Sequence, residues 1–170
     1  MRIIQLLFST FFLVTLTFAS QKEDTLKGVI LNRVSQFITY KETEEEFVIC
    51  IYNDSMYQTL YTLFEDKEYK NRDIHVLQTN SLKDLPACDI FYVSKPSSKL
   101  SQKLIKSLES YTLLVSDSLE SLDDGFMLVL YLQNNKVNIG INQQALVDAN
   151  LKVNYRLLKV ASTVINPVKN

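Results

Sequence analysis

The chain has 170 residues, of which 46% are hydrophobic and 22% are charged, and its formal net charge is −1. This size suits one domain with a proper core, and the balanced charge argues against a general nucleic-acid binder. Three widely separated glycines exclude the glycine-rich loops that bind nucleotides, and the histidine and two cysteines lack the close spacings of a Cys/His zinc site. Composition therefore excludes most familiar catalytic motifs, and we expect no cofactor and no metal.

The first residues have the pattern of a secretory signal peptide. Arg2 precedes an apolar run from residue 3 to residue 18, and Thr17 and Ala19 stand at the third and first positions before a cleavage site. We expect residues 1–19 to be a signal peptide and residues 21–166 to form a single α/β domain. An uncleaved N-terminal anchor is the alternative, although the run is shorter than the roughly 20 residues of a membrane-spanning helix.

The expected export bears on whether the two cysteines are bonded to each other. In an oxidising compartment, Cys50 and Cys88 are most simply a disulfide, and both lie in or beside apolar runs that read as strands. Closing a loop of this length stabilises a fold by about 4 kcal/mol in the chain-entropy model. The alternative is two buried free thiols.

The first half of the chain alternates helical and strand patterns. Leu26, Ile30, Val34, Phe37 and Ile38 recur at three- and four-residue steps, which predicts a helix through Tyr40. Short apolar runs then predict buried strands, with a second helical stripe after the first of them. The expected elements are a strand at 47–52, a helix at 56–64, a charged loop at 66–71, and strands at 74–77 and 89–93.

The second half predicts a hairpin and two further helices. A helix is expected over residues 99–108 and a strand over 111–115. Residues 126–132 and 136–141 flank a Gln-Asn-Asn turn, which is a hairpin signal. Asn142 is expected to cap a helix, and the last helix is expected from about Asn154 to Val164.

Together these elements predict a Rossmann-like three-layer α/β domain. Its sheet is expected to be mostly parallel, with right-handed crossovers and an antiparallel hairpin at the C-terminal edge, and without a nucleotide-binding glycine loop.

Polar residues follow several of the predicted strands. In a parallel sheet the carboxyl ends of the strands form a crevice, where a small polar ligand can bind. The simpler interpretation is that these residues cap helices and make turns. The candidate ligand-binding residues are Asp54, Ser55, Ser94, Ser116 and Asp117.

Three basic residues near the C-terminus are spaced to share one face of the predicted last helix. They are Lys152, Arg156 and Lys159, and they are candidates for contacting an acidic partner. The alternative is a solvated face whose charge suits a helix C-terminus.

The mature chain contains six blocks of a recognisable pattern, in this order: Phe47–Tyr52, Cys88–Ser94, Leu113–Asp117, Val137–Asn142, Leu151–Val153 and Leu157–Ala161. Taken together, these blocks resemble the YfiR family of bacterial periplasmic proteins. Tyr40 stands near the place of the family's tryptophan-proline, and Asn150 replaces a usual glycine at a turn that asparagine tolerates.

The resemblance implies a non-enzymatic, exported binding protein in the periplasm. It would regulate, by repression, a membrane-bound signalling enzyme such as a diguanylate cyclase, and thereby cyclic di-GMP output and biofilm. The implied partner is the periplasmic part of an inner-membrane diguanylate cyclase or kinase, with an outer-membrane lipoprotein as a second partner; a homodimer is left open, and nucleic acid is not expected. The alternative function is a periplasmic small-ligand binding protein that uses the crevice at the strand ends.

Overall fold

The computed structural model describes residues 21–43, 45–53, 56–64, 66–108 and 111–167. The predicted signal peptide, residues 1–19, lies outside the described residues, as do two of the candidate ligand-binding residues, Asp54 and Ser55. Within the described ranges, no helix combines the length and the apolar character needed to cross a bilayer.

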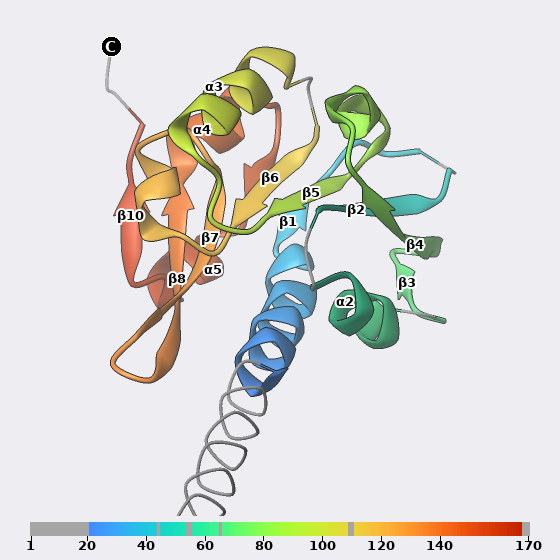
Figure 1. Cartoon of the computed structure of the whole chain (residues 1–170), viewed down its shortest axis with the longest axis horizontal. Coiled ribbons are helices and arrows are strands. Elements are labelled where there is room, and N and C mark those ends of the chain that lie inside the picture. Colours follow the sequence, from blue (N-terminus) through green and yellow to red (C-terminus); the bar gives the residue numbers. More distant parts are fainter. Residues whose placement is uncertain (1–20, 44, 54–55, 65, 109–110, 168–170) are drawn as a thin grey trace, which may run out of the picture.

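A helix over residues 21–35, named the N-terminal helix here, begins the described chain. The other helical elements are short and alternate with strands (Figure 1). They are α2 (Met56–Phe64), η1 (Leu82–Ala87), α3 (Ser98–Ser107), η2 (Leu119–Leu122), α4 (Gln143–Asp148) and α5 (Tyr155–Val160).

The main sheet has eight strands in the order β10-β8-β7-β6-β5-β2-β4-β3. Pairing is parallel from β4 through β2, β5 and β6 to β7 and again between β8 and β10, whereas β7–β8 and β3–β4 are antiparallel. The strands are β2 (Phe47–Tyr52), β3 (Glu68–Tyr69), β4 (Arg72–Thr79), β5 (Ile90–Val93), β6 (Leu113–Ser116), β7 (Leu128–Gln133), β8 (Lys136–Asn142) and β10 (Thr163–Ile165).

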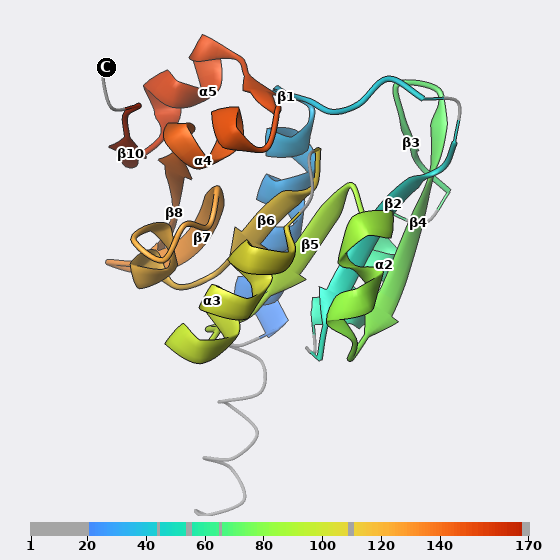
Figure 2. The same cartoon turned by 90° about the horizontal axis from the view of Figure 1, so that it is seen from above.

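Helices cover both faces of this sheet. The N-terminal helix and α2 lie on one side and α3 and α4 on the other, as Figures 1 and 2 show from two directions. Strands β5 and β6 are buried along their whole length, which places the core at the centre of the sheet. The predicted three-layer, mostly parallel α/β fold is therefore confirmed.

The N-terminal helix packs closely on α2 because Gly28 has no side chain. A Cβ at this position would lie 2.5 Å from Leu63 Cδ1 and 3.1 Å from Leu60 Cδ2. The glycine thus permits an approach that any larger residue would obstruct.

The C-terminal part of the chain differs from the prediction. The predicted last helix, 154–164, is divided: α5 ends at Val160, and residues 163–165 form β10 against β8. The β7–β8 hairpin is consequently inside the sheet, and β10 occupies the edge that we expected the hairpin to form. Thr163, Val164 and Ile165 are β-branched, and a paired strand exploits this property better than a helix end does.

The N-terminal region differs as well. The N-terminal helix ends at residue 35, and β1 (Ile38–Thr39) pairs with β9 (Lys152–Val153) instead of continuing the helix. The buried stripe is rotated from the predicted one, since Lys27, Leu31, Val34 and Ile38 are buried while Leu26 is 46% exposed. The predicted charged loop at 66–71 contains the short strand β3.

Candidate functional site

The structure brings together two of the predicted strand-end residues, Ser94 and Asp117. Ser94 follows β5 and Asp117 follows β6, and these strands are parallel neighbours. The Ser94 hydroxyl lies 3.1 Å from each carboxylate oxygen of Asp117, and the Lys95 backbone N–H donates to Asp117 Oδ1 at 2.9 Å. The Asp117 carboxylate therefore ties the ends of two strands to one another.

A cation that the sequence did not single out completes this arrangement. Lys27, on the N-terminal helix, places its Nζ 3.0 Å from Asp117 Oδ2 and 2.6 Å from Glu23 Oε1. The Lys27 side chain is only 3% exposed. Burial alone lowers the pKa of Lys27, but the hydrogen bonds and charges of Glu23 and Asp117 outweigh burial and raise that pKa above the ordinary value.

A hollow of about 580 Å³ opens beside this pair. It is lined by both signs of charge, including Glu23, Lys27, Lys95 and Asp117. A polar ligand would meet side chains that already neutralise one another, so the cluster is better arranged to hold the N-terminal helix against the sheet than to capture an ion.

Ser116, another predicted ligand-binding residue, points into the protein. Its side chain is buried, and its Oγ accepts from the Ser118 backbone N–H at 3.3 Å and lies 3.1 Å from Ser121 Oγ. These contacts are those of a turn-forming serine, which is the simpler of the two interpretations that the sequence allowed.

The opposite end of the sheet carries a second buried ion pair, between Arg72 and Asp89. Arg72 donates to both Asp89 oxygens, at 3.2 and 2.9 Å, and to the backbone carbonyls of Glu45 and Glu46. Asp89 also accepts from the Val48 backbone N–H at 2.9 Å. The pair thus joins the starts of β2, β4 and β5, which is a positioning role in the fold.

Cys50 and Cys88 form a disulfide, as the sequence predicted for an oxidising compartment. Cys50 lies in β2, and Cys88 lies between η1 and β5. The bond therefore holds η1 over the sheet, next to the Arg72–Asp89 pair.

The three C-terminal basic residues are all exposed, but they do not share one helix. Lys152 lies in β9, before α5 begins, whereas Arg156 and Lys159 are on α5. The predicted common helix face is wrong because the helix starts at Tyr155, after the β1–β9 pairing and the Asn154 cap.

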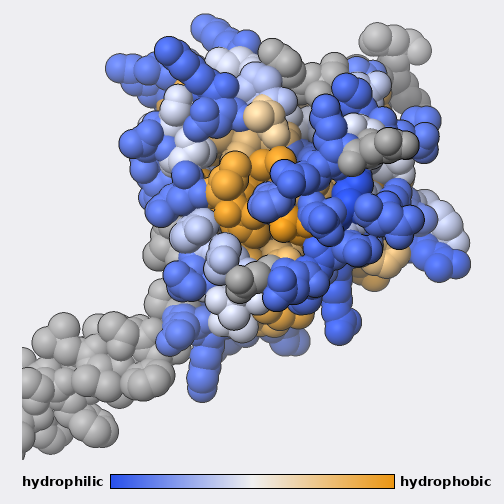
Figure 3. Space-filling view, turned by 90° about the vertical axis from the view of Figure 1, so that its right-hand side faces the viewer, coloured by the Kyte–Doolittle hydropathy of each residue, from blue (hydrophilic) through white to orange (hydrophobic). Residues whose placement is uncertain are grey.

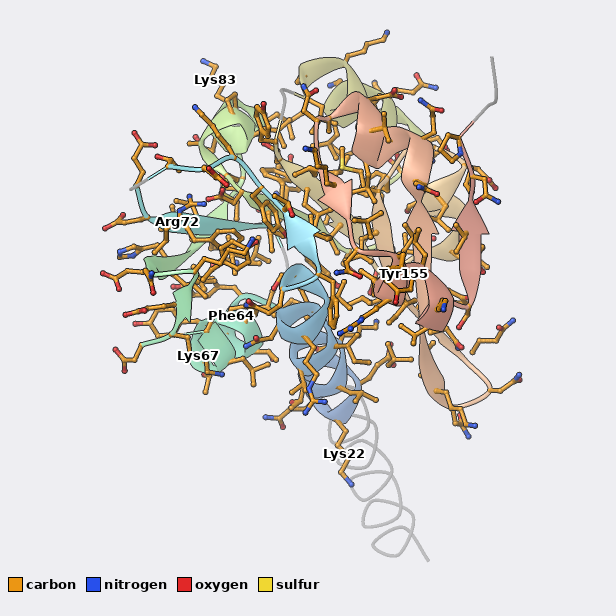
Figure 4. The ribbon with its side chains drawn as sticks, turned by 180° about the vertical axis from the view of Figure 1, so that it is seen from behind. Lys22, Phe64, Lys67, Arg72, Lys83 and Tyr155 are labelled. Atoms are coloured by element: carbon orange, nitrogen blue, oxygen red, sulfur yellow. A yellow bond between two sulfur atoms is a disulfide. The ribbon has the colours of Figure 1, made fainter. Side chains whose placement is uncertain are left out.

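Two exposed apolar side chains accompany these cations. Tyr155 is 59% and Val160 is 67% exposed, and Lys159 Nζ lies 4.9 Å from the centre of the Tyr155 ring. Tyr155 lies on the opposite side of the N-terminal helix from Arg72 (Figure 4). We call Lys152, Tyr155, Arg156, Lys159 and Val160 the basic surface.

Pairing of strands fixes the basic surface to the start of the domain. Ile38 pairs with Val153, and the Asn154 backbone N–H donates to Phe37 O at 2.8 Å. The Asn154 side chain in turn accepts from the Arg156 N–H at 2.9 Å and caps α5. These bonds fix the position of the basic surface relative to β1 and the end of the N-terminal helix.

Lys27 and Arg72 are the residues that sequence reasoning missed. A signal for Lys27 existed, because it stands four residues before Leu31, on the stripe that continues through Val34 and Ile38. No comparable local signal marks Arg72, whose partners lie far away in the chain, just before β2 and β5. In the part of the chain that the structure describes, no three His, Cys, Asp or Glu side chains gather where they could hold a metal ion.

A comparison with known protein families gives one match. The sequence profile of the DUF4154 family, described as YfiR/HmsC-like, matches residues 24–162. No curated protein is significantly similar in sequence.

Two solved structures resemble this chain at low sequence identity. A conserved domain protein from Vibrio cholerae O1 biovar El Tor superimposes with a TM-score of 0.56 at 8% identity, over 81% of this chain and 60% of that one. The ABC domain from Streptococcus pneumoniae, solved in complex with L-Trp, gives a TM-score of 0.48 at 9% identity, over 71% of this chain and 55% of that one. This chain thus covers less than two thirds of either protein, and the likeness to the Vibrio protein supports the fold alone.

Proposed function

Because the chain belongs to the YfiR/HmsC-like family, whose members are periplasmic regulators of diguanylate cyclase signalling, we propose that it represses a membrane-bound signalling enzyme by direct contact. The family match, which extends over residues 24–162, is the observation that carries the proposal. Family members are regulators rather than enzymes and act with an inner-membrane signalling protein.

The contact that we propose is made by the basic surface. Tyrosine and arginine are among the residue types that dominate the energetics of protein interfaces. Tyr155 and Val160 supply apolar area, and Arg156 and Lys159 supply charge on the same short helix. The complementary partner is an acidic region with apolar residues on the periplasmic part of the enzyme.

Repression then follows from a shift in populations. A protein that binds the inactive state of an enzyme more tightly than the active state moves the equilibrium toward the inactive state. The extent of the shift is limited by the difference between the two affinities. Repression of this kind needs binding alone, and the regulator need not catalyse a reaction.

The test compares two charge reversals of equal size. The triple variant Lys152→Glu, Arg156→Glu, Lys159→Glu alters the basic surface, and Lys99→Glu, Lys103→Glu, Lys106→Glu alters exposed positions on α3. We expect the unaltered protein and the α3 variant to recover an inner-membrane signalling protein from membranes and to lower cyclic di-GMP. We expect the basic-surface variant to lose both effects.

Two results would overturn the proposal. The first is that the unaltered protein recovers no signalling protein and leaves cyclic di-GMP unchanged. The second is that the two triple variants behave alike, which would remove the basic surface from the mechanism.

The alternative function, small-ligand binding at the strand-end crevice, has less support from the geometry. Ser94 and Asp117 bond to each other, and Lys27 neutralises the carboxylate. A real ligand there would raise the melting temperature by mass action, so a thermal-shift screen tests this alternative directly.

A further inference from the structure

The N-terminal helix turns one side to the core and the opposite side outward. On the inner side Gly28 lies against α2, and Leu31 is completely buried. The outer side follows steps of four, three and four residues, a spacing that places side chains one above another on a helix. Its members, which we call the helix stripe, are Lys22, Leu26, Val29 and Arg33.

Apolar side chains lie between basic ones along the helix stripe. Lys22 and Arg33 are exposed at its two ends, and between them Leu26 is 46% exposed and Val29 is half-buried. Phe37, which is 38% exposed, follows just beyond the end of the helix. Long basic side chains can lay their carbon stems along an apolar surface and extend their charged ends away from it. The helix stripe therefore presents apolar area with a cation at each end.

Acidic side chains are missing from the exposed positions around the helix stripe. The other exposed residues between positions 21 and 39 are uncharged, and they are Gln21, Thr25, Gln36 and Thr39. The two acids of the helix, Glu23 and Asp24, are half-buried, and Glu23 forms an ion pair with Lys27. Neither α2 nor α5 contains an acidic residue. The exposed charge here is therefore positive, although the whole chain has a formal net charge of −1.

The N-terminal helix lies between α2 and α5. Figure 4 shows it with Phe64 of α2 on one side and Tyr155 of α5 on the other. The exposed Arg156 and Lys159 of α5 add to the positive charge on that second side. Positive charge thus extends from the helix stripe to the basic surface.

Other parts of the described chain lack this combination of charge and apolar area. Figure 3, which faces the side of the molecule where β4 lies, shows an apolar patch with hydrophilic residues around it. Leu77 of β4 is 50% exposed, but no lysine or arginine occurs between residues 74 and 79. Helix α3 shows the opposite case, because its three lysines are exposed while its leucines and its isoleucine are buried or half-buried.

We propose that the helix stripe lies on the surface of a lipid bilayer that contains anionic phospholipids. Lys22 and Arg33 contact the lipid phosphates, and Leu26 and Val29 enter the boundary between the head groups and the acyl chains. Helices that lie in this boundary combine basic and apolar side chains in the same way, and anionic lipids attract each nearby lysine or arginine. A bilayer supplies negative charge and apolar area along the whole stripe, whereas a protein partner would have to match both at fixed positions.

The inference goes beyond the proposed function and does not depend on it. The helix stripe and the basic surface have no residue in common, so variants of one leave the side chains of the other unchanged. Vesicles made of lipid alone contain no signalling enzyme. Failure to bind them would therefore leave the proposed contact with the enzyme standing.

Co-sedimentation of the exported protein with vesicles tests the proposal. Vesicles of phosphatidylcholine mixed with phosphatidylglycerol are compared with vesicles of phosphatidylcholine alone, which measure any contribution from an N-terminal leader. We expect the unaltered protein to prefer the anionic vesicles, and we expect added salt to weaken this preference because it screens exposed charges.

The charge of the helix stripe is tested by a double reversal. Lys22→Glu with Arg33→Glu is expected to lower partitioning onto the anionic vesicles at least about tenfold. The matched control is Lys99→Glu with Lys103→Glu, which reverses two exposed charges on α3. The control is expected to change partitioning by less than about twofold, because α3 lies on the other side of the sheet.

The apolar part of the helix stripe is tested without changing charge. Leu26→Ser is expected to lower partitioning at least about threefold, since it removes apolar area that enters the bilayer. Leu132→Ser is the matched control, because Leu132 is 48% exposed and lies on β7, away from the stripe. This control is expected to leave partitioning unchanged.

Three results would overturn the proposal. The first is that the unaltered protein binds neither kind of vesicle, or binds both equally. The second is that either stripe variant behaves like its control. The third is that Lys22→Glu with Arg33→Glu loses a signalling protein from membrane extracts while its binding to anionic vesicles is unchanged, which would make the helix stripe a protein interface.

Discussion

Lys27 Nζ lies 3.0 Å from Asp117 Oδ2, although the two residues are 90 positions apart in the chain. The lysine belongs to the N-terminal helix, and the aspartate directly follows β6, near the centre of the sheet. Their pairing anchors the start of the described chain at the place where the strand-end crevice would otherwise be open.

Breaking this pair is expected to destabilise the fold. Lys27→Met leaves a buried carboxylate without its cation, which costs about 3 kcal/mol of unfolding free energy by analogy with other buried pairs. Denaturation in urea measures the loss. Lys22→Met is the control, because Lys22 is exposed on the same helix.

A double-mutant cycle completes the test. Lys27→Met with Asp117→Asn removes both charges, so the pair of changes is expected to cost less than the sum of the single changes. Additive losses, or a Lys27→Met cost equal to that of Lys22→Met, would contradict an energetic link between Lys27 and Asp117.

Stability is expected to fall in alkaline solution. The pKa of Lys27 is raised in the folded state, and burial raises the pKa of Tyr40 well above its ordinary value. A raised pKa contributes stability that is complete below the unfolded-state pKa, about 10 for these groups, and is lost as the pH rises through the folded-state value.

Chemical denaturation at pH values below and above about 10 checks whether the free energy of unfolding falls as the pH rises. Tyr40→Phe removes the tyrosine contribution and leaves the contribution of Lys27 to the loss of stability above about pH 10. Stability that increases between neutral and strongly alkaline pH would contradict the assignment.

The disulfide between Cys50 and Cys88 is expected to contribute strongly to stability. It closes a loop with a sequence separation of 38, and the chain-entropy model gives about 4 kcal/mol for such a loop. Replacing both cysteines by alanine should lower the denaturation midpoint by a corresponding amount. Free thiols counted in the denatured, unreduced protein should be absent, and two thiols per chain would show that the bond does not form.

Arg72 is expected to resist even a conservative change. A lysine cannot reproduce the fork that bonds both Asp89 oxygens while also reaching the carbonyls of Glu45 and Glu46. Arg72→Lys should therefore cost about 2 kcal/mol of unfolding free energy, the scale of a buried charged hydrogen bond. The exposed Arg33→Lys is the matched control and should cost almost nothing.

Local elements were predictable where short-range pattern decides the structure. The strand β2 and the helix α2 have the predicted bounds, Phe47–Tyr52 and Met56–Phe64. Asn142 caps α4 through its side-chain oxygen, which accepts from the Ala145 N–H at 3.0 Å, and Asn150 adopts the left-handed backbone expected of it, with φ of 58°. Each of these features depends on residues only a few positions apart.

Elements whose identity depends on a distant partner were missed. Residues 163–165 read as the end of a helix, but β8 is available to pair with them. Ile38 and Thr39 likewise continue a helical pattern, yet they pair with Val153 and Lys152. In both cases hydrogen bonds to a remote strand outweigh a weak local preference.

The sequence by itself determined the α/β class, most of the strands and helices, and the family resemblance, because hydrophobic periodicity and the order of short motifs are properties of neighbouring residues. Only the tertiary structure decided that Lys27 pairs with Asp117 and that the basic residues sit partly on β9. These features arise when segments far apart in the chain are brought together, and the free energy that selects such contacts comes from burial and pairing, which no local window of sequence contains.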